Sequence, residues 1–114
     1  MKPLELHPDA REELVAIVDW YRSHDARIGA RVVGEIGRVF EAIREAPSAS
    51  PEVEGRVRRR LLRGFPFAVF FRVDASSILV VAVAHHAREP GYWRSRSSPE
   101  DSTLHDRGSE AAER

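Results

Sequence analysis

The hydrophobic pattern of the chain changes its period near residue 55, and this change limits the folds open to it. Before that point, apolar residues recur at helical spacing in one stretch that begins at Pro8 and a second that ends at Ala46-Pro47. After it, the pattern alternates or is continuously apolar, as in β-strands. The chain is therefore expected to place a pair of helices on a sheet, in the α+β class.

Two helices are expected in the first half of the chain, after a short strand at Leu4–His7. Pro8-Asp9-Ala10 begins the first helix, with proline in the first turn and an acid at the positive end of the helix dipole. Ser23-His24-Asp25 interrupts the apolar spacing, so the two helices should form an antiparallel hairpin. Three glycines of the second helix are expected to let it approach the first closely: Gly29, Gly34 and Gly37.

Three strands are expected in the second half. A loop over Pro47–Gly55 leads to a basic strand at Arg56–Arg63, followed by a turn and a strand at Phe65–Val73. Ile78–Ala84 is continuously apolar, which is typical of a central strand buried on both faces. With the N-terminal strand, the sequence predicts a three- to four-stranded, mainly antiparallel sheet with the helical hairpin packed on it.

The net charge of zero conceals three segments of different charge. Residues 1–54 carry −4, residues 55–96 carry +7 and residues 97–114 carry −3, and 17 of the 18 basic residues are arginines. We expect one domain over residues 1–96 and an acidic, disordered tail over 97–114, which has almost no apolar residues to bury. The basic segment predicts an acidic or nucleic-acid-related partner despite the neutral total.

Several classes of protein are excluded by composition. The chain has no cysteine, and therefore no disulfide or thiolate metal site. Its longest apolar run has seven residues, against about 20 for a membrane span, and no signal peptide is visible after Met1. We therefore expect a cytoplasmic protein, and no cofactor is expected. A metal site is not expected either, because the adjacent His85 and His86 should face opposite sides of a strand.

The ordered motifs of residues 1–96 resemble the RelE/ParE superfamily of bacterial toxins from type II toxin–antitoxin modules, most closely its ParE-like, plasmid stabilisation branch. The motifs are Pro8-Asp9-Ala10, Trp20-Tyr21, Ile28-Gly29-Ala30-Arg31, Glu45-Ala46-Pro47, Val57-Arg58-Arg59, Arg63-Gly64-Phe65-Pro66-Phe67, Phe70-Phe71-Arg72-Val73, Ala82-Val83-Ala84-His85, Arg88-Glu89-Pro90-Gly91-Tyr92-Trp93 and Arg96. The combination is more specific than any one motif.

The resemblance implies a toxin neutralised by a cognate antitoxin, in a toxin–antitoxin hetero-oligomer. ParE-like members inhibit DNA gyrase without being enzymes, whereas RelE-like members are ribosome-dependent mRNA endonucleases. The first activity is expected here, because Lys2 is the only lysine and the Lys-rich catalytic set of the nucleases is absent. Ribosome-dependent cleavage is the alternative, and a degenerate, non-toxic partner-binding protein is the second alternative.

Six arginines are the candidates for binding the target or a phosphate: Arg58, Arg59, Arg60, Arg63, Arg88 and Arg96. Strand alternation places Arg58 and Arg60 on one face and Arg59 on the other, so the arginines cannot all face one cleft. If the protein is a nuclease, its catalytic residues would be His85, Arg88 and Tyr92, with a histidine as base because arginine does not lose its proton. Trp93 is expected to pack in the core.

Overall fold

The computed structural model describes residues 1–88 and 91–97, so the predicted tail lies almost entirely outside the described residues. The described elements, in chain order, are β1 (Leu4–Leu6), α1 (Pro8–His24), α2 (Ala26–Glu45), a 3₁₀ turn at Pro47–Ala49, β2 (Glu52–Glu54), β3 (Val57–Leu61), β4 (Phe67–Val73), β5 (Ile78–His85) and α3 (Arg94–Ser97). None of these helices is long and apolar enough to cross a membrane.

The strands form one sheet in the order β1-β5-β4-β3-β2. β1 runs parallel to β5, and the other neighbouring strands are antiparallel. This confirms the α+β class, but the prediction of three to four strands was too low by one. The additional strand, β2, lies in the segment predicted to be a loop, because its Glu-Val-Glu sequence between Pro51 and Gly55 does not resemble a strand.

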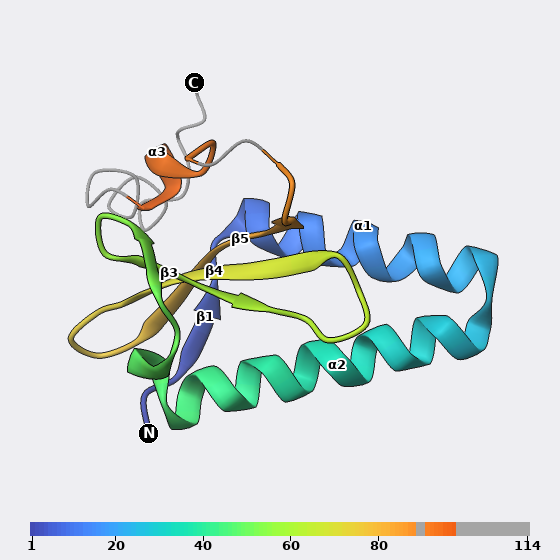
Figure 1. Ribbon diagram of the computed structural model, residues 1–114, viewed down its shortest axis with the longest axis horizontal. Coiled ribbons are helices and arrows are strands. Elements are labelled where there is room, and N and C mark those ends of the chain that lie inside the picture. The colour runs from blue at the N-terminus through green and yellow to red at the C-terminus, as the bar shows by residue number, and fades with distance from the viewer. Residues whose placement is uncertain (89–90, 98–114) are drawn as a thin grey trace.

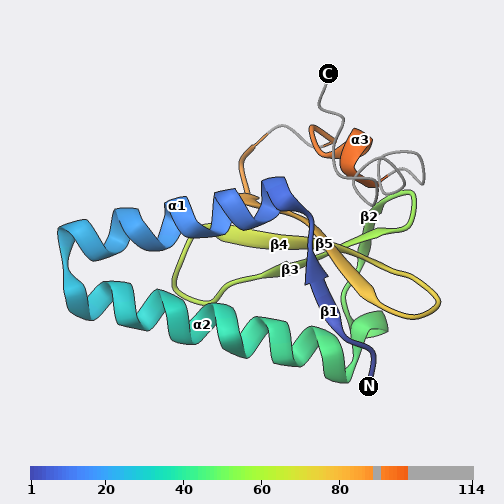
Figure 2. The same ribbon diagram turned by 180° about the vertical axis from the view of Figure 1, so that it is seen from behind.

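The two long helices lie antiparallel on one face of the sheet (Figures 1 and 2). Asp25 separates them: its extended backbone ends α1, and its side chain accepts a hydrogen bond from Arg27 N at 2.8 Å to begin α2. A Cβ on Gly29 would lie 2.6 Å from Arg22 Cγ, which confirms the predicted close approach there. The same prediction was wrong for Gly34 and Gly37, which face open space.

β5 is buried on both faces, as its apolar run predicted. Val80 and Val83 pack with Phe71 and the helices on one face. On the other face, Val81 and Ala84 belong to a second core with Val57, Phe70 and Trp93. The segment from Gly91 to α3 covers this second face, with α3 beside β2 in both views (Figures 1 and 2).

Candidate functional site

Trp93 attaches the C-terminal segment to the sheet. Its side chain is 2% exposed, and its ring centroid lies 5.5 Å from that of Phe70 in β4. Gly91 precedes it with a φ of 88°, a conformation that glycine adopts readily, and Arg94 N then donates to Gly91 O to start α3. The predicted core position of Trp93 is confirmed, and the residues around it are held close to β5.

The carboxylate of Glu13 joins this segment to α1. Its Oε1 accepts a hydrogen bond from Val83 N at 3.0 Å, and its Oε2 accepts one from Tyr92 OH and one from Arg96 Nη1, both at 3.0 Å. The contact compensates for the shortness of β1, which pairs with β5 only as far as Val80. Beyond that residue, side chains satisfy backbone groups of β5 that a neighbouring strand would otherwise bind.

Arg96 is held by contacts within the protein. Besides Glu13, its Nη1 donates to Val81 O at 3.1 Å, and its Nε lies 3.6 Å from Asp9 Oδ2. The side chain is only 15% exposed. The arginine predicted from the sequence to bind a target or phosphate therefore fills the open edge of β5 in this structure.

Two guanidinium groups lie close to the ring of Tyr92. Arg88 Cζ is 3.8 Å from the centre of the tyrosine ring, and Arg96 Cζ is 5.0 Å from it. Burial, and then the neighbouring Glu13 carboxylate, raise the pKa of Tyr92 to about 12. The hydroxyl therefore stays protonated at neutral pH and acts as a donor to Glu13.

His85 and His86 are both exposed at the end of β5. Their ring centroids lie 4.9 Å apart, so the expectation that they face opposite sides was wrong. The strand ends at His85, and His86 no longer follows its alternation. His85 Nδ1 accepts a hydrogen bond from Ala87 N at 3.0 Å, and within the described ranges no cluster of potential metal ligands is found.

The arginines of β3 are divided between the two faces, as alternation predicted. Arg58 and Arg60 pair with Phe71 and Val69, which face the helices, whereas Arg59 pairs with Phe70 on the other face. Arg58 donates to Ser50 O at 2.6 Å and lies 3.4 Å from Glu52. Arg58 is thus used to attach the loop before β2 to the sheet.

Arg63 lies in the turn after β3, where Glu35 of α2 fixes the backbone. Arg63 N donates to Glu35 Oε2 at 2.6 Å, while Arg38 binds both oxygens of the same carboxylate at 2.8 and 2.6 Å. The hydrogen bond from Arg38, together with that from Arg63 N, lowers the pKa of Glu35 to about 2 although partial burial opposes it. The Arg63 side chain itself is exposed.

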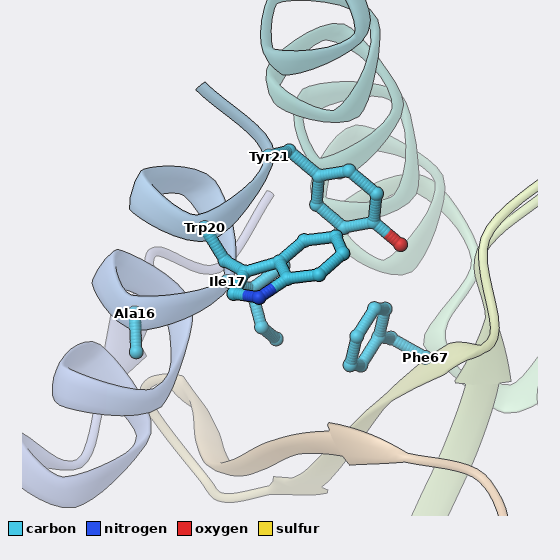
Figure 3. A pocket seen from close by; sticks show the side chains of 5 residues that line it. All are labelled: Ala16, Ile17, Trp20, Tyr21 and Phe67. Carbon is cyan, nitrogen blue, oxygen red and sulfur yellow. The ribbon is translucent and has the colours of Figure 1, made fainter. Parts of the chain in front are cut away.

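An open apolar pocket of about 340 Å³ lies between α1 and β4, lined by Ala16, Ile17, Trp20, Tyr21 and Phe67 (Figure 3). Trp20 is 56% exposed, and the ring of His24 stacks on it at a centroid distance of 4.0 Å. Among the described residues no charged side chain lines the pocket, so it suits an apolar group rather than a phosphate.

Comparison with known protein families identifies the class of the chain. A family model for the ParE toxin of the type II toxin–antitoxin system, parDE, matches residues 4–90. The chain belongs to this family. The resemblance seen in the motifs is thereby confirmed, on its ParE-like branch.

The fold agrees with that of a solved structure described as the chromosomal ParDE TA system from P. aeruginosa. The two share 22% identity with a TM-score of 0.65, and the similar region covers 75% of this chain and 96% of the other. A comparison with curated proteins finds no match. The C-terminal segment from Gly91 to Ser97 lies beyond the residues that the ParE family model matches.

Two residues that organise this ParE toxin were missed from the sequence. Glu13 resembles the other acids on the surface of α1 and has no sequence neighbour that marks it. Glu35 has Arg38 three residues later, a spacing that indicates an ion pair but not the contact with Arg63 N. The groups that Glu13 binds lie 70 to 83 residues away in the sequence. Arg63 N, which donates to Glu35, lies 28 residues away. No pattern within a helix reports such contacts.

Proposed function

We propose that this ParE-family toxin arrests growth by inhibiting DNA gyrase. Membership of the ParE family supports this target over the ribosome. The proposed activity is binding rather than catalysis, so it needs no general base, cofactor or metal. Because gyrase acts on DNA in the bacterial cytoplasm, the protein is proposed to act there as well.

The observation that carries this proposal is the state of Tyr92. A tyrosine that serves an endonuclease as catalytic acid has to give its proton to the RNA. Here the hydroxyl already donates to Glu13, and its pKa is raised to about 12. The tyrosine is therefore suited to support Arg88 and poorly suited to proton transfer at neutral pH.

Four of the six predicted arginines are proposed to contact the target: Arg59, Arg60, Arg63 and Arg88. Because Arg59 and Arg60 lie on opposite faces of β3, the proposed contact extends over both sides of that strand. None of the four forms an ion pair with a carboxylate of the described residues, in contrast to Arg58 and Arg96. Arg63 and Arg88 are exposed, and their guanidinium groups suit carboxylate or phosphate groups on gyrase or its DNA.

A cognate antitoxin is the proposed partner, in a toxin–antitoxin hetero-oligomer. The similar solved structure is described as a ParDE system, and residues 55–96 of this chain carry a net +7. An acidic antitoxin segment would be attracted to this part of the toxin. Co-expression with the protein encoded next to the toxin should restore growth.

Ribosome-dependent mRNA cleavage is the alternative, favoured by the exposed pair His85 and His86 beside Arg88, whose backbone N donates to His85 O at 2.9 Å. Expression in cells distinguishes the two. Gyrase inhibition predicts growth arrest with relaxed plasmid DNA and intact mRNA. Growth arrest with mRNA cut in the ribosomal A site contradicts the proposal, and normal growth at verified expression favours the degenerate partner-binding protein.

A further inference from the structure

The guanidinium group of Arg88 has few contacts to hold it in place. The side chain is exposed, and within the described residues no carboxylate lies within ion-pair distance. Its contact is the ring of Tyr92, 3.8 Å from Cζ. The orientation of Arg88 therefore depends on where the tyrosine ring lies.

The tyrosine ring is in turn held by Glu13. Trp93 fixes the segment through apolar packing, and the Tyr92 ring packs against the same core with Arg96 Cζ 5.0 Å from its centre. The hydroxyl of Tyr92 adds a directional contact, its 3.0 Å hydrogen bond to Glu13 Oε2. Glu13 is itself oriented by Val83 N and by Arg96, and its side chain is 22% exposed. These contacts connect α1, β5 and the C-terminal segment in a chain that ends at Arg88.

We propose that Glu13 is a positioning residue, which holds Tyr92 so that Arg88 points toward an anionic group of the target. This rests on the proposed function, to which it adds a residue on α1. A guanidinium that is oriented before binding loses less conformational entropy when the target binds. Glutamine at position 13 has a single acceptor oxygen in place of two and no charge, so it cannot keep both Val83 N and Tyr92 OH on separate oxygens or pair with Arg96.

The test is a double-mutant cycle on the full chain, with inhibition of DNA supercoiling by purified gyrase as the readout. We expect Glu13→Gln to raise the inhibitory concentration about fivefold in the wild-type background, equivalent to the net contribution of one typical hydrogen bond. In the Arg88→Ala background Glu13→Gln should not raise the inhibitory concentration further, because Glu13 acts on the target through the position of Arg88. Tyr92→Phe, which keeps the ring but lacks the hydroxyl, should behave as Glu13→Gln does.

Glu12→Gln is the matched control. Glu12 is an exposed acid on the same helix with the same change in charge, and it should leave inhibition unchanged in both backgrounds. If Glu13→Gln reduces inhibition of supercoiling equally in the wild-type and Arg88→Ala backgrounds, its role is structural alone and the proposal is overturned. The proposal is also overturned if Glu13→Gln does not reduce inhibition in either background.

A target-independent readout separates this inference from the proposed function. Growth arrest by the same chains at matched expression repeats the cycle without assuming that gyrase is the target. If the effect of Glu13→Gln on growth arrest depends on Arg88, but the purified chain does not inhibit gyrase, the proposed target is overturned and the role of Glu13 is retained. A wild-type chain that neither arrests growth nor inhibits gyrase overturns both.

Discussion

Tyr92 donates a 3.0 Å hydrogen bond to Glu13, a residue that precedes it by 79 positions. This contact makes the C-terminal segment part of the folded domain, since it joins the segment to α1 while Trp93 packs it on the sheet. The exposed arginine next to this segment, Arg88, is therefore displayed from a well-anchored part of the protein.

Trp93→Ala should destabilise the protein by about 3 kcal/mol, because it leaves a cavity beside Phe70 in the second core. Trp20→Ala is the matched control, since that tryptophan is 56% exposed and should cost much less. The free energy of unfolding in urea measures both. A loss for Trp93→Ala that is as small as the one expected for Trp20→Ala would contradict the role of Trp93 in attaching the C-terminal segment.

Gly29→Ala and Gly34→Ala should change stability in opposite directions. At position 29 the new methyl group would lie 2.6 Å from Arg22 Cγ and 3.0 Å from its Cα, so the helices must separate at a cost of about 1 to 3 kcal/mol. At position 34 it meets open space, and alanine should stabilise α2 by about 0.5 to 1 kcal/mol. Thermal unfolding of both variants checks the sign, and a stabilised Gly29→Ala variant would contradict the close contact.

Glu35 should make stability depend on pH in the acidic range. Its pKa is lowered from the usual 4.5 to about 2, so its ionised form stabilises the fold fully above about pH 4.5. That stabilisation is lost as the pH falls through about 2. Partial solvent screening leaves an expected contribution of about 1 to 2 kcal/mol.

Urea unfolding of wild type and Glu35→Gln at pH 6 and pH 2.5 measures this contribution. The wild type should be the more stable at pH 6, and the difference should shrink at pH 2.5. A difference that does not change with pH would mean that Arg38 and Arg63 N do not hold the ionised carboxylate.

Arg58→Ala and Arg88→Ala should separate stability from toxicity. Arg58 donates to Ser50 O and pairs with Glu52, so its loss should cost about 1 kcal/mol of stability. Arg88 is exposed, and its loss should weaken growth arrest without lowering the melting temperature. If Arg88→Ala remains fully toxic at equal expression, the target-binding surface lies elsewhere.

Much of the fold could be predicted because local patterns determine it. The run Ile78–Ala84 correctly predicted a strand buried on both faces, and the interruption at Ser23-His24-Asp25 predicted the helical hairpin, although α1 continues through His24. β2 was missed because its pairing with β3 depends on partners rather than on its own composition. The predicted ends of β3 also extended into the turn, whose Gly64 has a φ of 79°.

The candidate site was less predictable, because it depends on which side chains meet across the fold. Six arginines were chosen by type, yet Arg58 and Arg96 form contacts within the protein. Glu13 was not chosen, although it binds three groups. Composition alone does not distinguish a cation that binds a target from one that satisfies a strand edge.

The central claim is tested most directly by titrating the full chain into a supercoiling assay with purified DNA gyrase and relaxed plasmid. The account predicts that supercoiling is inhibited, that the cognate antitoxin restores it, and that Arg88→Ala weakens inhibition while Glu12→Gln does not. Undiminished supercoiling at a large excess of folded toxin, with mRNA cut on ribosomes by the same preparation, would contradict it.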